Sequence, residues 1–493
     1  MAAETSVHGG RQRGDRRVTR DILREFTLGS LSRAIQSRDI SPVEVTEACL
    51  ARIDRLDRTL NAFITLTPDR ALAAARRAER EITAGRPRGP LHGVPIALKD
   101  LFATAGVRTT CGSRILRDWV PAEDAGVVTR LHEAGAVILG KLNMSEFAYA
   151  AIHSDYGPPR NPWNLDRFTG GSSSGSGAAV AGGLCFGATG TDTGGSIRNP
   201  AAHCGIVGLK PTYGLVSRAG VVPLAWSLDH AGPMARTVED AAILLDAMAG
   251  FDPADPTSMA PAPGGAGARP PLEASAPALR SLRLGAVDGQ LAKETSADVA
   301  ARVREAVRVL QPLVAEVEEV ILPMLEEMVA AWWTICLAEA SAYHQQTLAA
   351  RAQDFGPIVR ERLQAGLAIP AVQYVQAQRV RRAAVLEFDK LLAHVDLLVL
   401  PATFAEAPPI AAADAVHSSQ VLRRRTVPTA PFNLLGLPAV SVPCGFTDSG
   451  LPVGLQIVGR RGEDRLVLAA AHLYEQSAGW WTRRPPLDER TPS

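Results

Sequence analysis

The sequence lacks an excess of charge of either sign, because 52 lysine and arginine residues stand against 51 aspartate and glutamate residues in a chain of 493. A net charge of +1 excludes a protein that binds nucleic acid by bulk attraction to phosphates. Long apolar runs are also missing, since no 18 uncharged apolar residues occur in a row, and we expect no membrane span. Apolar residues still make up 46% of the chain, which is enough for a large buried core.

Cysteine is scarce and scattered. The six cysteines form no CxxC pair and no Cys/His cluster at zinc spacing, which excludes a zinc-finger type of site. We expect reduced, buried thiols in a cytoplasmic protein. The Arg-rich residues 1–24 lack the apolar core of a secretory signal and predict a flexible tail. The cysteines are Cys49, Cys111, Cys185, Cys204, Cys336 and Cys444.

Helix signals alternate with short apolar runs along the chain. Pro42 and Pro68 each follow a Ser or Thr, and this pattern predicts helices that begin at these prolines. The apolar runs 94–98, 136–139 and 397–400 predict buried strands. Such an alternation of helices and buried strands is typical of an α/β layered fold.

A proline-rich stretch interrupts this pattern at about 252–280. Seven prolines between Pro253 and Pro277, with many Gly and Ala residues, predict a surface loop or a linker. Two arrangements remain open from composition alone. The stretch either separates two domains, or it is an excursion from one sheet-centred unit.

Two segments rich in glycine and serine carry the candidate chemistry. Residues 170–177 lead directly into the helix-forming run 178–182, so we expect them to begin a helix and not to link domains. Residues 192–196 read Asp-Thr-Gly-Gly-Ser. Glycines directly before a serine let backbone N–H groups approach a ligand closely, which is how an oxyanion hole is built. Ser196 is then the candidate nucleophile.

A serine hydroxyl needs a base to become a good nucleophile. No histidine is marked as that base, and the GxSxG match at 171–175 follows a loop sequence, whereas a nucleophile elbow follows a buried strand. Lys99 ends an apolar run, and desolvation there would lower the pKa of a lysine from its usual ~10.4. Lys99 is therefore the candidate base, acting through a bridging serine such as Ser172.

The sequence resembles the amidase signature family, in the general amidase branch that is related to the A chain of glutamyl-tRNA amidotransferases. The matching text is Gly-Gly-Ser-Ser-Ser-Gly-Ser-Gly at 170–177, Gly-Thr-Asp-Thr-Gly-Gly-Ser-Ile-Arg at 190–198, and Lys99 with Asp100. The resemblance implies an α/β fold, with a central mixed twisted β-sheet covered by α-helices on both faces. It predicts one amidase signature domain over 25–480, comprising a helical part at about 25–85, a signature core at about 90–240 and the proline-rich surface loop, between tails at 1–24 and 481–493.

The resemblance also implies roles for single residues. Ser196 is the acyl nucleophile, Ser172 the bridging cis-serine and Lys99 the base of a Ser–cisSer–Lys triad. No metal or organic cofactor is implied. The resemblance further implies that an oxyanion hole is formed by the backbone N–H groups of Thr193, Gly194, Gly195 and Ser196. It also implies that three side chains support the site, namely Ser173, Asp192 and Arg198.

Two functions share this chemistry. The first is a serine amidohydrolase, a monomer or homodimer, that cleaves a small or aryl carboxamide, with esters and carbamates as further candidates and no membrane or direct nucleic-acid partner. The second is the glutaminase component of a tRNA-dependent amidotransferase, which works only in a complex. Phe147 and Tyr149 are candidates for the substrate pocket by position, as are Trp332 and Trp333 for the wall of an access channel.

Overall fold

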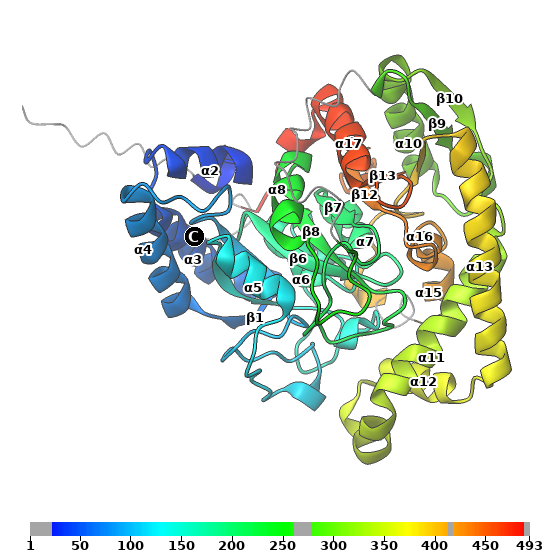
Figure 1. Cartoon of the computed structure of the whole chain (residues 1–493), viewed down its shortest axis with the longest axis horizontal. Helices are drawn as coiled ribbons and strands as arrows, with labels where there is room; N and C mark the ends of the chain where they lie inside the picture. The colour runs from blue at the N-terminus through cyan, green and yellow to red at the C-terminus, as the bar shows by residue number, and fades with distance from the viewer. Residues whose placement is uncertain (1–21, 261–278, 413–417, 488–493) are drawn as a thin grey trace, which may run out of the picture.

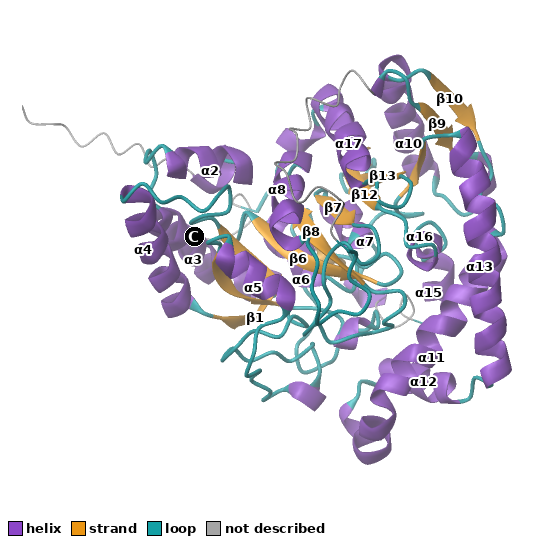
Figure 2. Ribbon diagram, in the orientation of Figure 1, coloured by secondary structure: helices purple, strands orange, loops and turns teal. Residues whose placement is uncertain are grey.

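The computed structural model describes residues 22–260, 279–412 and 418–487. Within them, a sheet of eleven strands crosses the molecule in the order β1-β3-β2-β6-β8-β7-β12-β13-β11-β9-β10. Strands β3, β2 and β6 run parallel, as do β11, β9 and β10, whereas the middle of the sheet is antiparallel. Helices cover both faces of this mixed sheet, and the predicted α/β class is confirmed (Figures 1 and 2).

The strands come from both halves of the chain, on either side of the proline-rich stretch. A small separate hairpin joins β4 (Arg160–Asn161) and β5 (Asn164–Phe168). The strands of the large sheet are β1 Phe63–Leu66, β2 Pro95–Lys99, β3 Val137–Leu142, β6 Gly187–Asp192, β7 Val207–Lys210, β8 His230–Ala235, β9 Arg283–Ala286, β10 Glu316–Glu319, β11 Leu397–Pro401, β12 Ala439–Phe446 and β13 Pro452–Val458.

The helices form the outer layers, and the long helices α11 and α13 pack together at the right of Figure 1. The described helices are α1 Ile22–Glu25, α2 Leu28–Gln36, α3 Pro42–Leu60, α4 Pro68–Thr83, α5 Gly126–Glu133, α6 Ser174–Ala181, α7 Arg198–Cys204, α8 Val238–Met248, α10 Ala297–Leu310, α11 Leu325–Arg351, α12 Pro357–Leu367, α13 Ala371–His394, α15 Ser419–Arg425, α16 Ala430–Leu434 and α17 Asp464–Ala478. None of these described helices is both long enough and apolar enough to span a membrane.

Local sequence explains why these elements begin where they do. Helix α3 begins at Pro42 because the Ser41 side chain accepts hydrogen bonds from two backbone N–H groups of the first turn. The glycine- and serine-rich segment leads into a helix, as predicted, but α6 already begins at Ser174, inside the segment and before the predicted run 178–182. Its small residues allow close packing, since a Cβ on Gly175 would lie 2.4 Å from the carbonyl oxygen of Ala62. The helix therefore packs closely against the chain just before β1 and just after β3.

The predicted ends of the domain need correction. Residues 1–21 and 488–493 lie outside the described residues, but the predicted tail of 1–24 ends too late. Ile22 and Leu23 form part of α1 and are buried, because both are apolar and pack into the core. The predicted tail of 481–493 likewise starts too early, since Leu487 is buried against the same core.

The proline-rich stretch lies within one sheet-centred unit. Residues 261–278 of the predicted loop at 252–280 lie outside the described residues. On either side, Asp255 and Leu279 are buried and anchor the flanking chain. Strand β7 precedes the stretch and strand β12 follows it, and the two pair directly in the sheet. The proline-rich stretch therefore does not separate two domains, and it is an excursion from a single domain.

Candidate active site

Lys99 is the last residue of β2 and is fully buried. Its side-chain nitrogen Nζ lies 2.7 Å from Ser172 Oγ and 2.8 Å from Thr191 Oγ1. Burial lowers the pKa of Lys99 to about 7, although the carboxylates of Asp192 and Asp229 act in the opposite direction. Near neutral pH a substantial fraction of this amine is therefore uncharged and able to accept a proton.

Ser172 and Ser173 lie just before α6 and connect the two glycine- and serine-rich segments. The Gly171–Ser172 peptide bond is cis. Ser173 Oγ donates a hydrogen bond to the carbonyl oxygen of Thr191 at 3.2 Å. The Ser173 N–H donates to the carbonyl oxygen of Ser196, also at 3.2 Å. The segment that follows β5 is thereby held against the segment that follows β6.

Ser196 lies half-buried between β6 and α7. It lines a cavity of about 40 Å³, together with Gly171, Thr193 and Gly194. Among the described residues, no hydrogen bond joins Ser196 Oγ to Ser172 Oγ. The structure thus brings Lys99 and Ser172 into direct contact and holds Ser196 on the adjoining loop.

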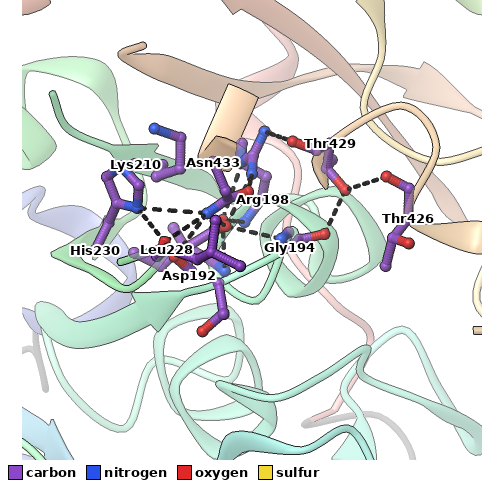
Figure 3. Close-up of polar contacts among 12 residues, drawn as sticks. Asp192, Gly194, Arg198, Lys210, Leu228, His230, Thr426, Thr429 and Asn433 are labelled. Atoms are coloured by element: carbon purple, nitrogen blue, oxygen red, sulfur yellow. Dashed lines mark hydrogen bonds and ion pairs between the residues drawn. The ribbon is translucent and has the colours of Figure 1, made fainter. Parts of the chain in front are cut away.

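The loop from 192 to 198 contains Ser196, and the side chains of Asp192 and Arg198 at its two ends contact each other. Figure 3 shows the polar contacts around these two residues. Their ion pair measures 2.8 Å, and both side chains are fully buried. The Asp192 carboxylate also accepts the N–H groups of Gly195 at 2.7 Å and Ile197 at 3.1 Å. Burial alone would raise the pKa of Asp192, but Arg198, with Lys210 and Asn433, holds that pKa below its usual value. A permanent carboxylate therefore fixes the loop from within.

Arg198 also ties this loop to the C-terminal half of the chain. Its guanidinium donates to Gln456 Oε1 and to Asn433 Oδ1, each at 2.7 Å, and to the carbonyl oxygen of Thr429 at 3.0 Å. Sequence reasoning did not assign roles to Thr429 or Asn433. These residues lie more than 200 positions from Arg198, and only the three-dimensional fold brings them to the loop.

The loop residues predicted to form the oxyanion hole differ in how they are engaged. Thr193 and Gly194 line the cavity beside Ser196. The Gly195 N–H already donates to Asp192. Gly194 has no room for a side chain, since a Cβ there would lie 2.3 Å from the ring of Trp332. The Thr193 hydroxyl donates to Asp229 at 2.6 Å, so that this side chain also holds the loop.

The two predicted pocket residues lie in different surroundings. Tyr149 lines the cavity at Ser196, as do Trp332 and Trp333. Phe147 does not line it. Its ring packs against His344 and Phe355 at centroid distances of 4.3 and 5.8 Å. Within the described part of the chain, no charged side chain lines this cavity, whose walls are formed by Ala148, Tyr149, Ala150, Gly171, Thr193, Gly194, Ser196, Asn199, Leu224, Trp332, Trp333, Cys336, Leu422 and Thr426.

A second cavity of about 290 Å³ adjoins the first and shares Ala148, Thr193 and Leu224 with it. Arg218 and Asp229 are among the residues that line it. Their charges are engaged inside the protein, because the Arg218 guanidinium lies 3.7 Å from an Asp255 carboxylate oxygen and the Asp229 carboxylate accepts several N–H and O–H groups. The space next to the loop of Ser196 is thus lined mainly by apolar and uncharged groups, with Arg218, Asp229 and Asp255 as the charged side chains of the larger cavity.

Comparisons with known proteins agree on one family. The family model described as Amidase matches residues 44–468. The A chain of glutamyl-tRNA(Gln) amidotransferase from Methylococcus capsulatus is 44% identical over 489 residues, which cover 93% of this chain and 98% of that relative. The structure of native peptide amidase from Stenotrophomonas maltophilia gives a TM-score of 0.79 at 35% identity, covering 94% of this chain and 98% of that one. The corresponding amidotransferase chain from Thermotoga maritima gives 0.76 at 35%, covering 92% and 95%.

The helix-covered mixed sheet and these relatives define an enzyme that acts on carbon–nitrogen bonds. The chain belongs to the amidase family. The resemblance predicted from the sequence is confirmed. The curated relatives carry the name of the amidotransferase component, and on this point the comparisons favour the second predicted function over the first.

Proposed function

We propose that this chain hydrolyses the C–N bond of an uncharged carboxamide through an acyl-enzyme on Ser196. The observation that supports it most strongly is the buried Lys99 side chain, whose Nζ lies 2.7 Å from Ser172 Oγ beside the loop of Ser196. A buried amine with a pKa near 7 has the properties that a general base needs at neutral pH.

In the proposed reaction, protons move along the two serines to the lysine. Neutral Lys99 accepts a proton from Ser172, which accepts one from Ser196 as the Ser196 oxygen attacks the amide carbon. The proton then passes to the amide nitrogen, the C–N bond breaks and the amine leaves, with Ser196 esterified. Water hydrolyses this ester by the same proton route, which restores Ser196 and releases the carboxylic acid.

The developing oxyanion would be stabilised by backbone N–H groups of the loop. The N–H groups of Thr193, Gly194 and Ser196 are the candidates, because the N–H of Gly195 is already bound to Asp192. Preorganised donors of this kind contribute strongly to acyl transfer in a site that excludes water.

The lining of the cavity supports an uncharged substrate. A charged group that leaves water needs a partner of opposite charge, since burying it alone costs several kcal/mol or more. Over the described residues, the cavity at Ser196 has aromatic, aliphatic and small polar walls and no charged side chain. The reacting carboxamide group meets these walls without an unpaired charge, and the rest of an aryl or alkyl substrate would extend into the adjoining cavity of about 290 Å³, where the charges of Arg218 and Asp229 are already engaged.

The names of the relatives support a second candidate, the glutaminase component of an amidotransferase. Its substrate glutamine carries an ammonium and a carboxylate, and both would need partners beyond the walls of this cavity. The sequence relatives favour this second candidate, whereas the cavity lining favours the first.

One experiment separates the two candidates. The purified full-length chain is incubated alone with a panel of neutral aryl amides and with glutamine, and then with glutamine plus the other components of an amidotransferase. Release of aryl amine by the chain alone supports the first proposal. Release of ammonia from glutamine only in the presence of the added components contradicts it and supports the second candidate. Ser196→Ala is the control, because either activity requires this oxygen.

A further inference from the structure

Every carbonyl group from Asp192 to Gly195 accepts a hydrogen bond from outside this short stretch. The Asp192 carbonyl accepts from Asn433 Nδ2 at 2.7 Å, and the Gly195 carbonyl accepts from the N–H of Asn199 at 2.7 Å. Thr429 Oγ1 donates to the Gly194 carbonyl at 2.6 Å, a contact drawn in Figure 3. The carbonyl of Thr193 accepts from the indole Nε1 of Trp332 at 2.7 Å, and it is this contact that bears on the site.

The carbonyl and the N–H of one trans peptide unit lie in a plane and point in opposite directions. A donor that fixes the carbonyl therefore also fixes the direction of the N–H in the same unit. The carbonyl of Thr193 shares its peptide unit with the N–H of Gly194. Among the described residues, this N–H has no acceptor, and Gly194 lines the cavity beside Ser196.

The neighbouring peptide unit gives an internal comparison. It joins Gly194 to Gly195, with its carbonyl held by Thr429 and its N–H bound to the Asp192 carboxylate. Both ends of this unit are engaged by the protein. Loss of the Thr429 hydroxyl would therefore disturb the loop. It would not change the direction of an N–H that is available to a substrate, because the N–H of this unit is already bound to Asp192.

We propose that Trp332 is a positioning residue that aims the Gly194 N–H at the oxyanion of the acyl-transfer reaction. The inference rests on the proposed function. The indole is suited to this task because it is a donor only, so its N–H binds the Thr193 carbonyl and does not accept from the loop. Its ring lies against Gly194, where a Cβ would come within 2.3 Å of it, and this close packing would restrict rotation of the peptide unit. Donation to the carbonyl also polarises the amide and strengthens its N–H as a donor.

The reaction needs this N–H mainly after the tetrahedral intermediate begins to form. Loss of a complete oxyanion donor costs about 10²–10³ in kcat, and a donor that is present but poorly aimed should cost about tenfold. Trp332→Phe should thus lower kcat about tenfold and leave KM nearly unchanged. An aldehyde analogue of the substrate, which forms a tetrahedral adduct on Ser196, should lose affinity by a similar factor, whereas a ground-state amide analogue should not.

Three further variants make the test specific. Trp163→Phe is the matched control, because it removes another buried indole bond to a backbone carbonyl, 2.8 Å from Nε1 to the oxygen of Cys204. It should leave kcat unchanged. Thr429→Val removes a bond to the neighbouring peptide unit and should lower kcat less than Trp332→Phe. If the smaller ring of Phe prevents folding, benzothienylalanine at position 332 keeps the bicyclic shape and replaces only the N–H by sulfur.

The role of Trp332 is tested by measuring kcat and KM of each variant with a neutral aryl amide. The inhibition constants of the aldehyde analogue and of the ground-state amide analogue are measured for the same variants. A fall in kcat with a parallel loss of aldehyde affinity supports it. A wild-type kcat, an equal loss of affinity for both analogues, or an effect no larger than that of Thr429→Val overturns it. If Ser196→Ala retains activity, then the proposed function itself fails, which distinguishes that failure from a failure of the role of Trp332.

Discussion

At the scale of single residues, the main feature is a lysine placed where its amine loses charge near neutral pH. Lys99 is fully buried, and this burial brings its pKa down to about 7. Below that pH the amine is protonated and cannot accept a proton, whereas above it the amine is a free base. We therefore expect kcat/KM for a neutral amide to rise with pH through about 7 and to level off above it.

The pH dependence is tested with Lys99→Arg. A guanidinium remains protonated at every accessible pH, so the variant should lose about 10²–10⁴-fold in kcat and should lack the rising limb. Lys390→Arg is the control, because Lys390 is an exposed lysine paired with Glu387 and should behave as wild type. A flat profile from pH 5 to 9 for the wild-type enzyme would show that Lys99 is not the base.

Several of these residues could be predicted from the sequence. Consecutive glycines before Ser196 and an apolar run before Lys99 are local patterns, and the structure brings Lys99 and Ser172 within hydrogen-bond distance. The donor from Trp332 could not be predicted, because it reaches Thr193 across 139 residues of sequence. Trp332 stands out in the sequence only as one of two aromatic residues on a helix, and both line the cavity.

At the scale of elements, helix α6 depends on small residues to approach the strands. Its residue Gly175 faces backbone, since a Cβ there would lie 2.4 Å from the oxygen of Ala62 and 2.5 Å from the oxygen of Asn143. Backbone cannot move aside as a side chain can. This contact explains why the buried helix next to Ser172 has glycine at position 175.

Gly175→Ala should destabilise the protein despite the higher helix propensity of alanine. We expect a loss of about 1–3 kcal/mol in the free energy of unfolding, as in other overpacked cores. Gly29→Ala in α2 is a matched control, because its nearest neighbour is the carboxylate end of the partly exposed Glu239 side chain, which can move away. Chemical denaturation of both variants measures the effect. Equal stability of the two variants would contradict the close packing of α6.

At the scale of the whole molecule, the site depends on both halves of the chain. Lys99, Ser172 and Ser196 come from the N-terminal half, whereas Asn433 and Gln456, which hold Arg198, come from the C-terminal half. Local sequence patterns predicted the α/β class. The prediction that both halves of the chain form one domain followed from the family resemblance. The pairing of β7 with β12 is long-range, and no short stretch of sequence encodes it.

The most direct test of Ser196 as the nucleophile is the site of covalent labelling by a fluorophosphonate probe, which forms a P–O bond to an activated serine and releases fluoride. The labelled full-length chain is digested and the modified peptide is located by mass spectrometry. We predict a single modified serine, Ser196, with no labelling in Ser196→Ala and slower labelling in Lys99→Arg. Modification of another residue, or undiminished labelling of Ser196→Ala, would contradict the assignment of Ser196 as the nucleophile.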